Sequence, residues 1–172
     1  MEFALSEEQG ILSESIKKMF DENISIDNLR DHSKGDKSLR ETIRGSIIDM
    51  GLPGLMVPEE YGGSGLGVLE ASLVAEQIGS YAVPSPWIGN SIMAPTAILF
   101  EKDNHLAEKW LPLIASGEIT ACISLSEVIG KRDDLGLTIS GDKVSGINIF
   151  GIDGELNPAI IITAVNNNLI LI

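Results

Sequence analysis

The stretch that decides the fold is GLPGLMVPEEYGGSGL, which runs from Gly51 to Leu66. Pro58 cannot stand inside a helix, and the residue before a proline is pushed towards an extended backbone. Gly62 and Gly63 allow the chain to turn sharply or to approach another surface closely. On spacing alone, the stretch predicts a long connection between two helices.

Helical patterns precede and follow this connection. Ser6 and Gln9 form a capping box ahead of apolar residues that recur at helical spacing as far as Phe20. A second amphipathic helix runs from Leu39 to Met50, and Gly51 is expected to end it. Residues 23–37 predict a loop or a short helix. Further helices are predicted over 69–78, over 85–100 with a kink at Pro95, and over 106–113.

The pattern changes at Gly117, after which β-branched residues and alternation dominate. Strands are predicted over 120–127, 137–150 and 158–165 and from 169 onwards, with a hairpin turn at 140–143. The fold class expected is therefore α+β, with an all-α helical bundle over residues 1–118 and a truncated antiparallel β domain over 119–172. The last strand has no cap or polar tail, which favours a piece of a longer protein over a strand that simply completes a sheet edge.

Composition narrows the classes of function. The 172 residues carry a formal net charge of −13, which argues against nucleic acid and anionic membranes as partners. No apolar run reaches the length of about 18 residues that a membrane span needs. Cys122 is the only cysteine, which excludes an internal disulfide and favours the cytoplasm. The two histidines are far apart in sequence, so no metal site is predicted.

Three ordered segments resemble the acyl-CoA dehydrogenase family. PEEYGGSGL within 58–66 resembles the family's "PEEYGG.GL" loop, and KWLPLIASGEI at 109–119 resembles its "K..LP.L..GE" segment. SGDKVSG at 140–146 resembles a family hairpin. The resemblance covers essentially the whole chain and implies a helical domain followed by the start of a middle β-barrel domain. The family's C-terminal four-helix domain has no counterpart in these residues.

The resemblance implies that the substrate is an acyl-CoA thioester, oxidised to its trans-2-enoyl form in fatty-acid or steroid side-chain catabolism. FAD is the implied redox cofactor, and an electron-transfer flavoprotein or a similar acceptor is the implied electron partner. A homo- or hetero-oligomer, dimeric or tetrameric, is also implied. The family's catalytic base is a glutamate of the third domain, so no catalytic residue is assigned here. Glu59 and Glu60 are expected to lie in a structural turn.

The first flavin-contact segment of the family, "TEP..GSD", corresponds to residues 126–133. Ser126 keeps the hydroxyl of the family's threonine, and the backbone amides of Leu125 and Ser126 are the candidates for the same end of the flavin ring. Val128 replaces the proline. Arg132 replaces the serine and is a candidate for binding substrate phosphate through its charged fork. The alternative is that 131–134 is a solvated charge cluster.

The second flavin-contact segment, "K.W/F-I-T-N", places Phe150 at the aromatic position and Ile152 at the threonine, whose hydroxyl is lost. Phe150 could equally be an ordinary core residue of a strand. Ser91 and Met93 fall in the region that lines the acyl pocket in relatives, although packing within a buried helix also explains them. Cys122 is expected to be a small buried hydrophobe.

Two functions stay open at this point. The first is an FAD-dependent dehydrogenase of a divergent branch, compatible with a mixed complex. The second is a non-catalytic structural or interaction subunit that does not itself bind FAD productively, because the altered positions 128, 132 and 152 weaken the flavin segments. A phosphate-loop or Rossmann enzyme is excluded, since neither GxxxxGK[ST] nor GxGxxG follows a strand.

Overall fold

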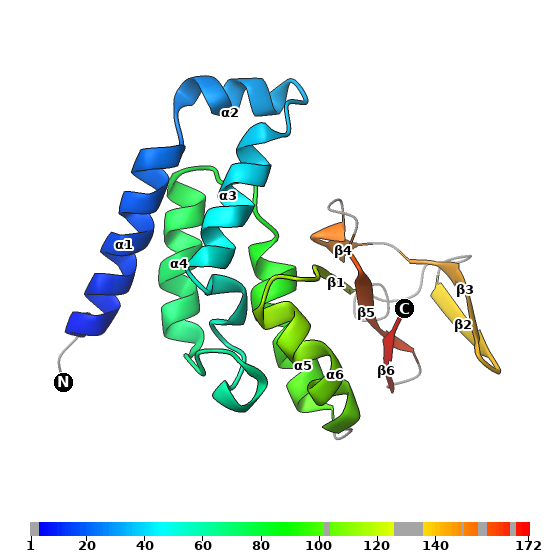
Figure 1. Cartoon of the computed structure of the whole chain (residues 1–172). Coiled ribbons are helices and arrows are strands. Elements are labelled where there is room, and N and C mark those ends of the chain that lie inside the picture. Colours follow the sequence, from blue (N-terminus) through cyan, green and yellow to red (C-terminus); the bar gives the residue numbers. More distant parts are fainter. Residues whose placement is uncertain (1–3, 102–103, 126–135, 149, 155–157, 166–167) are drawn as a thin grey trace.

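The computed structural model describes residues 4–101, 104–125, 136–148, 150–154, 158–165 and 168–172. Helices form the first part of the chain and strands the second (Figure 1), so the predicted α+β class is confirmed. The helices are α1 (Glu7–Asn23), α2 (Ile26–Ser33), α3 (Ser38–Asp49), α4 (Val68–Ser80), α5 (Ala94–Phe100) and α6 (Asn104–Ala115). No helix among the described residues is long and apolar enough to cross a membrane.

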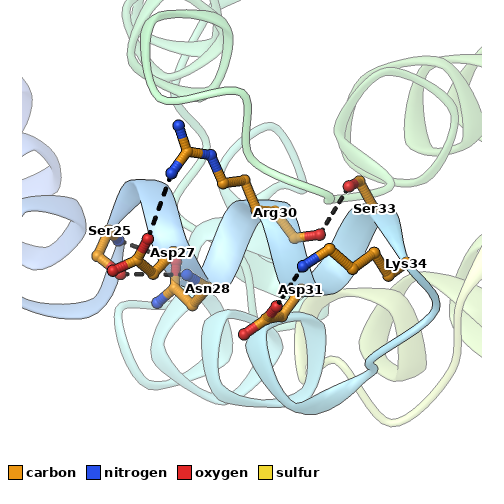
Figure 2. A network of polar contacts seen from close by, with 7 residues as sticks. All are labelled: Ser25, Asp27, Asn28, Arg30, Asp31, Ser33 and Lys34. Carbon is orange, nitrogen blue, oxygen red and sulfur yellow. Dashed lines mark hydrogen bonds and ion pairs between the residues drawn. The ribbon is translucent and has the colours of Figure 1, made fainter.

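Helices α1, α3 and α4 stand side by side, and α2 lies across one end of them (Figure 1). The predicted capping box of α1 is present, with the Gln9 N–H donating to Ser6 Oγ and the Ser6 N–H donating to Gln9 Oε1. Helix α2 resolves the choice left open for residues 23–37. Its cap and its ion pairs are made by short-range contacts of Ser25, Asp27, Asn28, Arg30, Asp31, Ser33 and Lys34 (Figure 2).

The connection between α3 and α4 is an ordered loop with two 3-10 turns, η1 (Leu52–Gly54) and η2 (Glu59–Tyr61). Gly51 ends α3 in the left-handed conformation, at φ 68°, as predicted. The loop folds back on itself through three backbone hydrogen bonds: the Ser64 N–H donates to Gly54 O, that of Gly65 to Val57 O, and that of Leu66 to Leu55 O, at 2.8–3.0 Å.

The predicted helix over 85–100 is divided into two. A π-helix, η3 (Trp87–Met93), leads into α5, and Pro95 sits in the first turn of α5. Pro95 has no N–H to donate to the carbonyl four residues earlier, so a regular α-helix cannot run through this point. The kink expected at Pro95 is thus a change of helix type. Short π-helical segments are often found at functional sites.

The strands form a four-stranded sheet in the order β4-β1-β5-β6 and a separate hairpin. The pairs β1–β4 and β5–β6 are antiparallel, as expected, whereas β1 and β5 pair in parallel, with Cys122 opposite Ile161. The hairpin closes at Ser140 and Lys143, where the sequence predicted its turn. The strand bounds are β1 (Ala121–Ser124), β2 (Gly136–Ser140), β3 (Lys143–Ile147), β4 (Gly151–Ile152), β5 (Ile160–Val165) and β6 (Asn168–Leu171).

The buried side chains form two hydrophobic clusters. The first lies among α1, α3 and α4, and the second joins α5 and α6 to β1 and β5. The loop between α3 and α4 contributes to both, because Leu52 and Leu55 belong to the first cluster and Val57 belongs to the second. The loop that carries the family resemblance therefore connects the helical bundle to the cluster that includes the sheet.

Trp87 ties the π-helix to the first cluster, since it is 2% exposed and its Nε1–H donates to Ala71 O at 3.2 Å. We expect Trp87→Phe to lower the free energy of unfolding by about 1.5 kcal/mol, through a lost hydrogen bond and a small cavity. Urea unfolding followed by circular dichroism measures this. Trp110→Phe is the matched control, because Trp110 is only partly buried, and an equal loss in both variants would contradict the assignment.

Candidate functional site

Strands β1 and β4 bring three of the predicted cofactor-contact residues together. Ile123 of β1 is paired with Ile152 of β4, and Leu125, two residues after Ile123, donates its backbone N–H to Phe150 O at 3.3 Å. Segments 25 residues apart in sequence thus meet at one edge of the sheet. The Leu125 amide, a candidate donor to a flavin, is engaged with Phe150 in this structure.

Phe150 is 48% exposed and its backbone is left-handed, at φ 57°. This conformation is uncommon for a bulky residue, and it accompanies a ring that is turned out of the core. The alternative of an ordinary core phenylalanine therefore does not hold for the described part of the chain. Leu125 and Ile152 are half-buried beside it.

The other two residues proposed for this end of the site, Ser126 and Arg132, lie outside the described residues, as does the charge cluster at 131–134. Glu59 and Glu60 form the exposed start of η2, which agrees with the turn expected for them.

Ser91 and Met93 both lie on η3, but their surroundings differ. Ser91 is buried, accepts a hydrogen bond from Asn90 Nδ2 at 3.3 Å and lines a cavity of about 180 Å³. Met93 is half-buried and packs against the second hydrophobic cluster. Of these two residues, Ser91 is thus the one that lines the 180 Å³ cavity among the described residues.

Asp153 is a site residue that the sequence interpretation missed. It follows β4 with φ 65°, and its Oδ2 accepts the N–H of Gly89 at 2.5 Å and that of Asn90 at 3.3 Å. Burial raises the pKa of the Asp153 carboxyl, and the two backbone donors offset part of this rise. In the sequence the only signal was an Ile-Asp-Gly tripeptide, which indicates a turn and no more.

Asn90 connects the same π-helix to β1. It is buried, and its Oδ1 accepts the backbone N–H of Ala121 at 2.8 Å. Cys122, the next residue of β1, is 2% exposed. Its burial, and to a smaller extent the charge of Asp153, raise the pKa of its thiol. A buried, protonated thiol suits the small hydrophobe that was predicted, because the thiolate is the reactive form of cysteine.

Two cavities lie where α3 faces the segment before η3. The first, of about 180 Å³, is lined by α3, by residues 84–86 and by Asn90, Ser91 and Thr120. The second, of about 340 Å³, reaches the end of β4 at Gly151, Asp153 and Gly154. Among the described residues, no group of three or more His, Cys, Asp or Glu side chains is placed to hold a metal ion.

Comparison with known proteins identifies the class to which this fold and site belong. The model of the acyl-CoA dehydrogenase N-terminal domain matches residues 6–118, so the chain belongs to the acyl-CoA dehydrogenase family. The mitochondrial isovaleryl-CoA dehydrogenase of Pongo abelii is 32% identical over 142 residues, which cover 81% of this chain and 33% of the relative. The chain spans about a third of the length of such curated relatives.

Solved structures show the same fold. The ChsE4-ChsE5 complex from Mycobacterium tuberculosis matches with a TM-score of 0.81 and 20% identity, covering 99% of this chain and 48% of that chain. An acyl-CoA dehydrogenase complexed with FAD from Bacillus anthracis matches with a TM-score of 0.74 and 20% identity, covering 92% and 28%. The expected resemblance to the family is thereby confirmed.

Proposed function

We propose that the chain belongs to an FAD-dependent acyl-CoA dehydrogenase that oxidises an acyl-CoA thioester in fatty-acid or steroid side-chain catabolism. The observation that carries this proposal is the family match over residues 6–118. It is supported by the name of the isovaleryl-CoA dehydrogenase relative and by the FAD of the Bacillus anthracis neighbour. Bound FAD would supply the electron acceptor, and the residues of this chain would bind and orient the reactants.

The residues at the β1–β4 edge fit one part of a flavin. The half-exposed ring of Phe150 offers a flat apolar surface, and Leu125 and Ile152 extend it. A planar aromatic ring system stacks favourably on such a surface. We propose Ser126 as the donor to the polar edge of the flavin and Arg132 as a contact of substrate phosphate.

We propose that the acyl chain lies along η3, beside Ser91 and Met93. The cavity at Ser91 supports this placement, as does the π-helical conformation of η3, because such segments are often found at functional sites. The base that removes the α-proton belongs to the third domain of the family. We propose that residues 1–118 form a helical domain and that residues 119–172 form the start of a β domain. We expect these residues to show no turnover with any acyl-CoA, because the base is a residue of a different domain.

We further propose that the protein acts as a homo- or hetero-oligomer that passes electrons to an electron-transfer flavoprotein or a similar acceptor. The ChsE4-ChsE5 neighbour is itself a complex, which supports this assembly. A cytoplasmic location is supported by the single buried cysteine.

The second candidate is a structural subunit that does not bind FAD productively. Two observations favour it. Ile152 cannot offer the hydroxyl of the family's threonine, and the Leu125 N–H is already donated to Phe150. The missing hydroxyl at Ile152 and the engaged N–H of Leu125 each remove one polar contact from the edge where a flavin would bind.

Titration of FAD, followed by quenching of flavin fluorescence, distinguishes the two candidates. If the first holds, FAD binds saturably, and Phe150→Ala weakens its affinity by about 5- to 10-fold because an aromatic stacking partner is lost. Phe100→Ala is the matched control, since Phe100 is 84% exposed on α5. Saturable binding that is unchanged by Phe150→Ala would contradict the proposed contact, and no binding at all would favour the structural subunit.

A further inference from the structure

The two cavities share one cationic side chain. Both are lined by Arg40, Pro84 and Ser85, so they adjoin each other at these residues. Arg40 lies in the first turn of α3 and is half-buried. The first cavity continues to Ser91 on η3, and the second continues to Gly151 and Asp153 at the end of β4.

Arg40 has no partner among the residues that the structure describes. It makes neither an ion pair nor a hydrogen bond there, whereas Arg44 donates from Nη2 to Gly117 O at 2.7 Å and Arg30 pairs with Asp27. The chain has more than twice as many acidic as basic side chains, so an unpaired guanidinium is unusual in it. Partial burial of a charge is unfavourable unless an opposite charge compensates it.

The surroundings of Arg40 suit a small anion. Ser85 and His32 also line the second cavity, and the Ser85 hydroxyl can donate a hydrogen bond to an anion. His32 adds no such donor in its neutral form, because its Nδ1, 2.9 Å from Asp36 O, carries the ring proton that bonds to this carbonyl. Asp153 shares this cavity, but its Oδ2 accepts the N–H groups of Gly89 and Asn90.

The shape and the charges select one kind of anion. A guanidinium fork matches the two oxygens of a carboxylate. A carboxylate also carries less charge than a phosphate dianion, and so it is repelled less by Asp153 in the same cavity. The cavity volume of about 340 Å³ has room for several carbon atoms besides the carboxylate.

We propose that Arg40 binds a carboxylate at the far end of the acyl group, so that the substrate class is an acyl-CoA that carries a second, free carboxyl group. This inference rests on the proposed function, because it takes the acyl chain to run along η3. Ser91 on η3 and Arg40 on α3 line the same first cavity, which supplies the path between them. The terminal carboxylate then lies against Arg40 and Ser85.

Binding of two thioesters and of free CoA, measured by isothermal titration calorimetry, tests the proposal on the whole 172-residue chain. Glutaryl-CoA carries the second carboxylate, pentanoyl-CoA has the same chain length without it, and free CoA has no acyl group. We expect glutaryl-CoA to bind about tenfold more tightly than pentanoyl-CoA. Arg40→Gln should abolish this difference and leave pentanoyl-CoA unchanged. Arg30→Gln, on exposed α2, is the matched control and should keep the difference (Figure 2).

A second measurement does not depend on the CoA moiety. The Nε–Hε signal of Arg40 in a nitrogen–proton NMR spectrum should shift with the monoethyl ester of glutaric acid and stay in place with the neutral diethyl ester. Equal shifts, or none, together with equal affinities for the two thioesters, would overturn the proposal. It would also be overturned if Arg40→Gln weakened free CoA as strongly as glutaryl-CoA, because Arg40 would then bind CoA phosphate.

The two proposals fail in different ways. Saturable FAD binding without any carboxylate preference rejects the role of Arg40 and leaves the dehydrogenase proposal intact. A carboxylate-dependent shift of Arg40 without FAD binding rejects the dehydrogenase proposal and with it the acyl-CoA as the source of the carboxylate.

Discussion

Replacing Gly63 with alanine is expected to lower the free energy of unfolding by about 3 kcal/mol, because the loop has no space for a Cβ at this position. An added Cβ would lie 2.0 Å from the backbone oxygen of Val57, 2.5 Å from Val57 Cβ and 2.6 Å from Gly54 O. These atoms cannot move away easily. Val57 is fully buried in the second cluster, and both oxygens accept hydrogen bonds from the loop itself.

Gly45→Ala provides the matched control for Gly63→Ala. Gly45 lies within α3 and nothing stands within 4 Å of the place of its Cβ, so alanine should raise the free energy of unfolding by about 0.5–1 kcal/mol. Urea unfolding measures both variants. A Gly63→Ala protein within about 1 kcal/mol of the wild type, with an unchanged dependence on urea, would show that the loop is not as tightly packed as described.

The local parts of the fold could be predicted from the sequence, because short-range chemistry sets them. The Ser6–Gln9 capping box, the left-handed glycine at Gly51 and the hairpin closed by Ser140 and Lys143 depend on neighbouring residues alone. The loop at 51–66 was recognisable from the order of its residues. Its mechanical role, in which Val57 and Leu55 join two clusters, was not, since that depends on what packs around it.

The parts that could not be predicted depend on contacts between distant segments. The parallel pairing of β1 with β5 follows from the path of the chain across the sheet, which alternation of residue types does not encode. Similarly, a π-helix and an α-helix have nearly the same apolar pattern, so η3 was read as one helix with α5. Leu125 and Phe150 were both predicted as flavin contacts because the family segments containing them could be recognised, but the hydrogen bond between them was not predicted.

Asp153 shows the same limit at the candidate site. Its two partners, Gly89 and Asn90, lie more than 60 residues earlier in the chain, so no local pattern could pair them. Together with the bond from Ala121 to Asn90, these contacts fasten η3 to the β1–β4 edge. This junction joins η3, which carries Ser91, to the strand pair that Phe150 precedes.

Replacing Asp153 with alanine is expected to lower the free energy of unfolding by about 2 kcal/mol, because the N–H groups of Gly89 and Asn90 lose their acceptor. Asp153→Asn is the informative partner variant. Its amide oxygen can accept the same two hydrogen bonds without placing a charge in a partly buried position. At neutral pH the asparagine variant should therefore be more stable than the wild type.

The stability difference between Asp153→Asn and the wild type is expected to depend on pH. Burial raises the pKa of Asp153 above its ordinary value of 3.8, so the folded state binds a proton more readily than the unfolded state. The free energy of unfolding that this proton contributes is fully present below the pKa of the unfolded state, and it is lost as pH rises through the pKa of the folded state. Denaturant titrations from pH 7 down to about pH 4 should thus show the advantage of Asp153→Asn shrinking as pH falls. An advantage that grew on acidification would mean that the two N–H donors outweigh burial, and that the carboxylate is the form that holds η3 to β4.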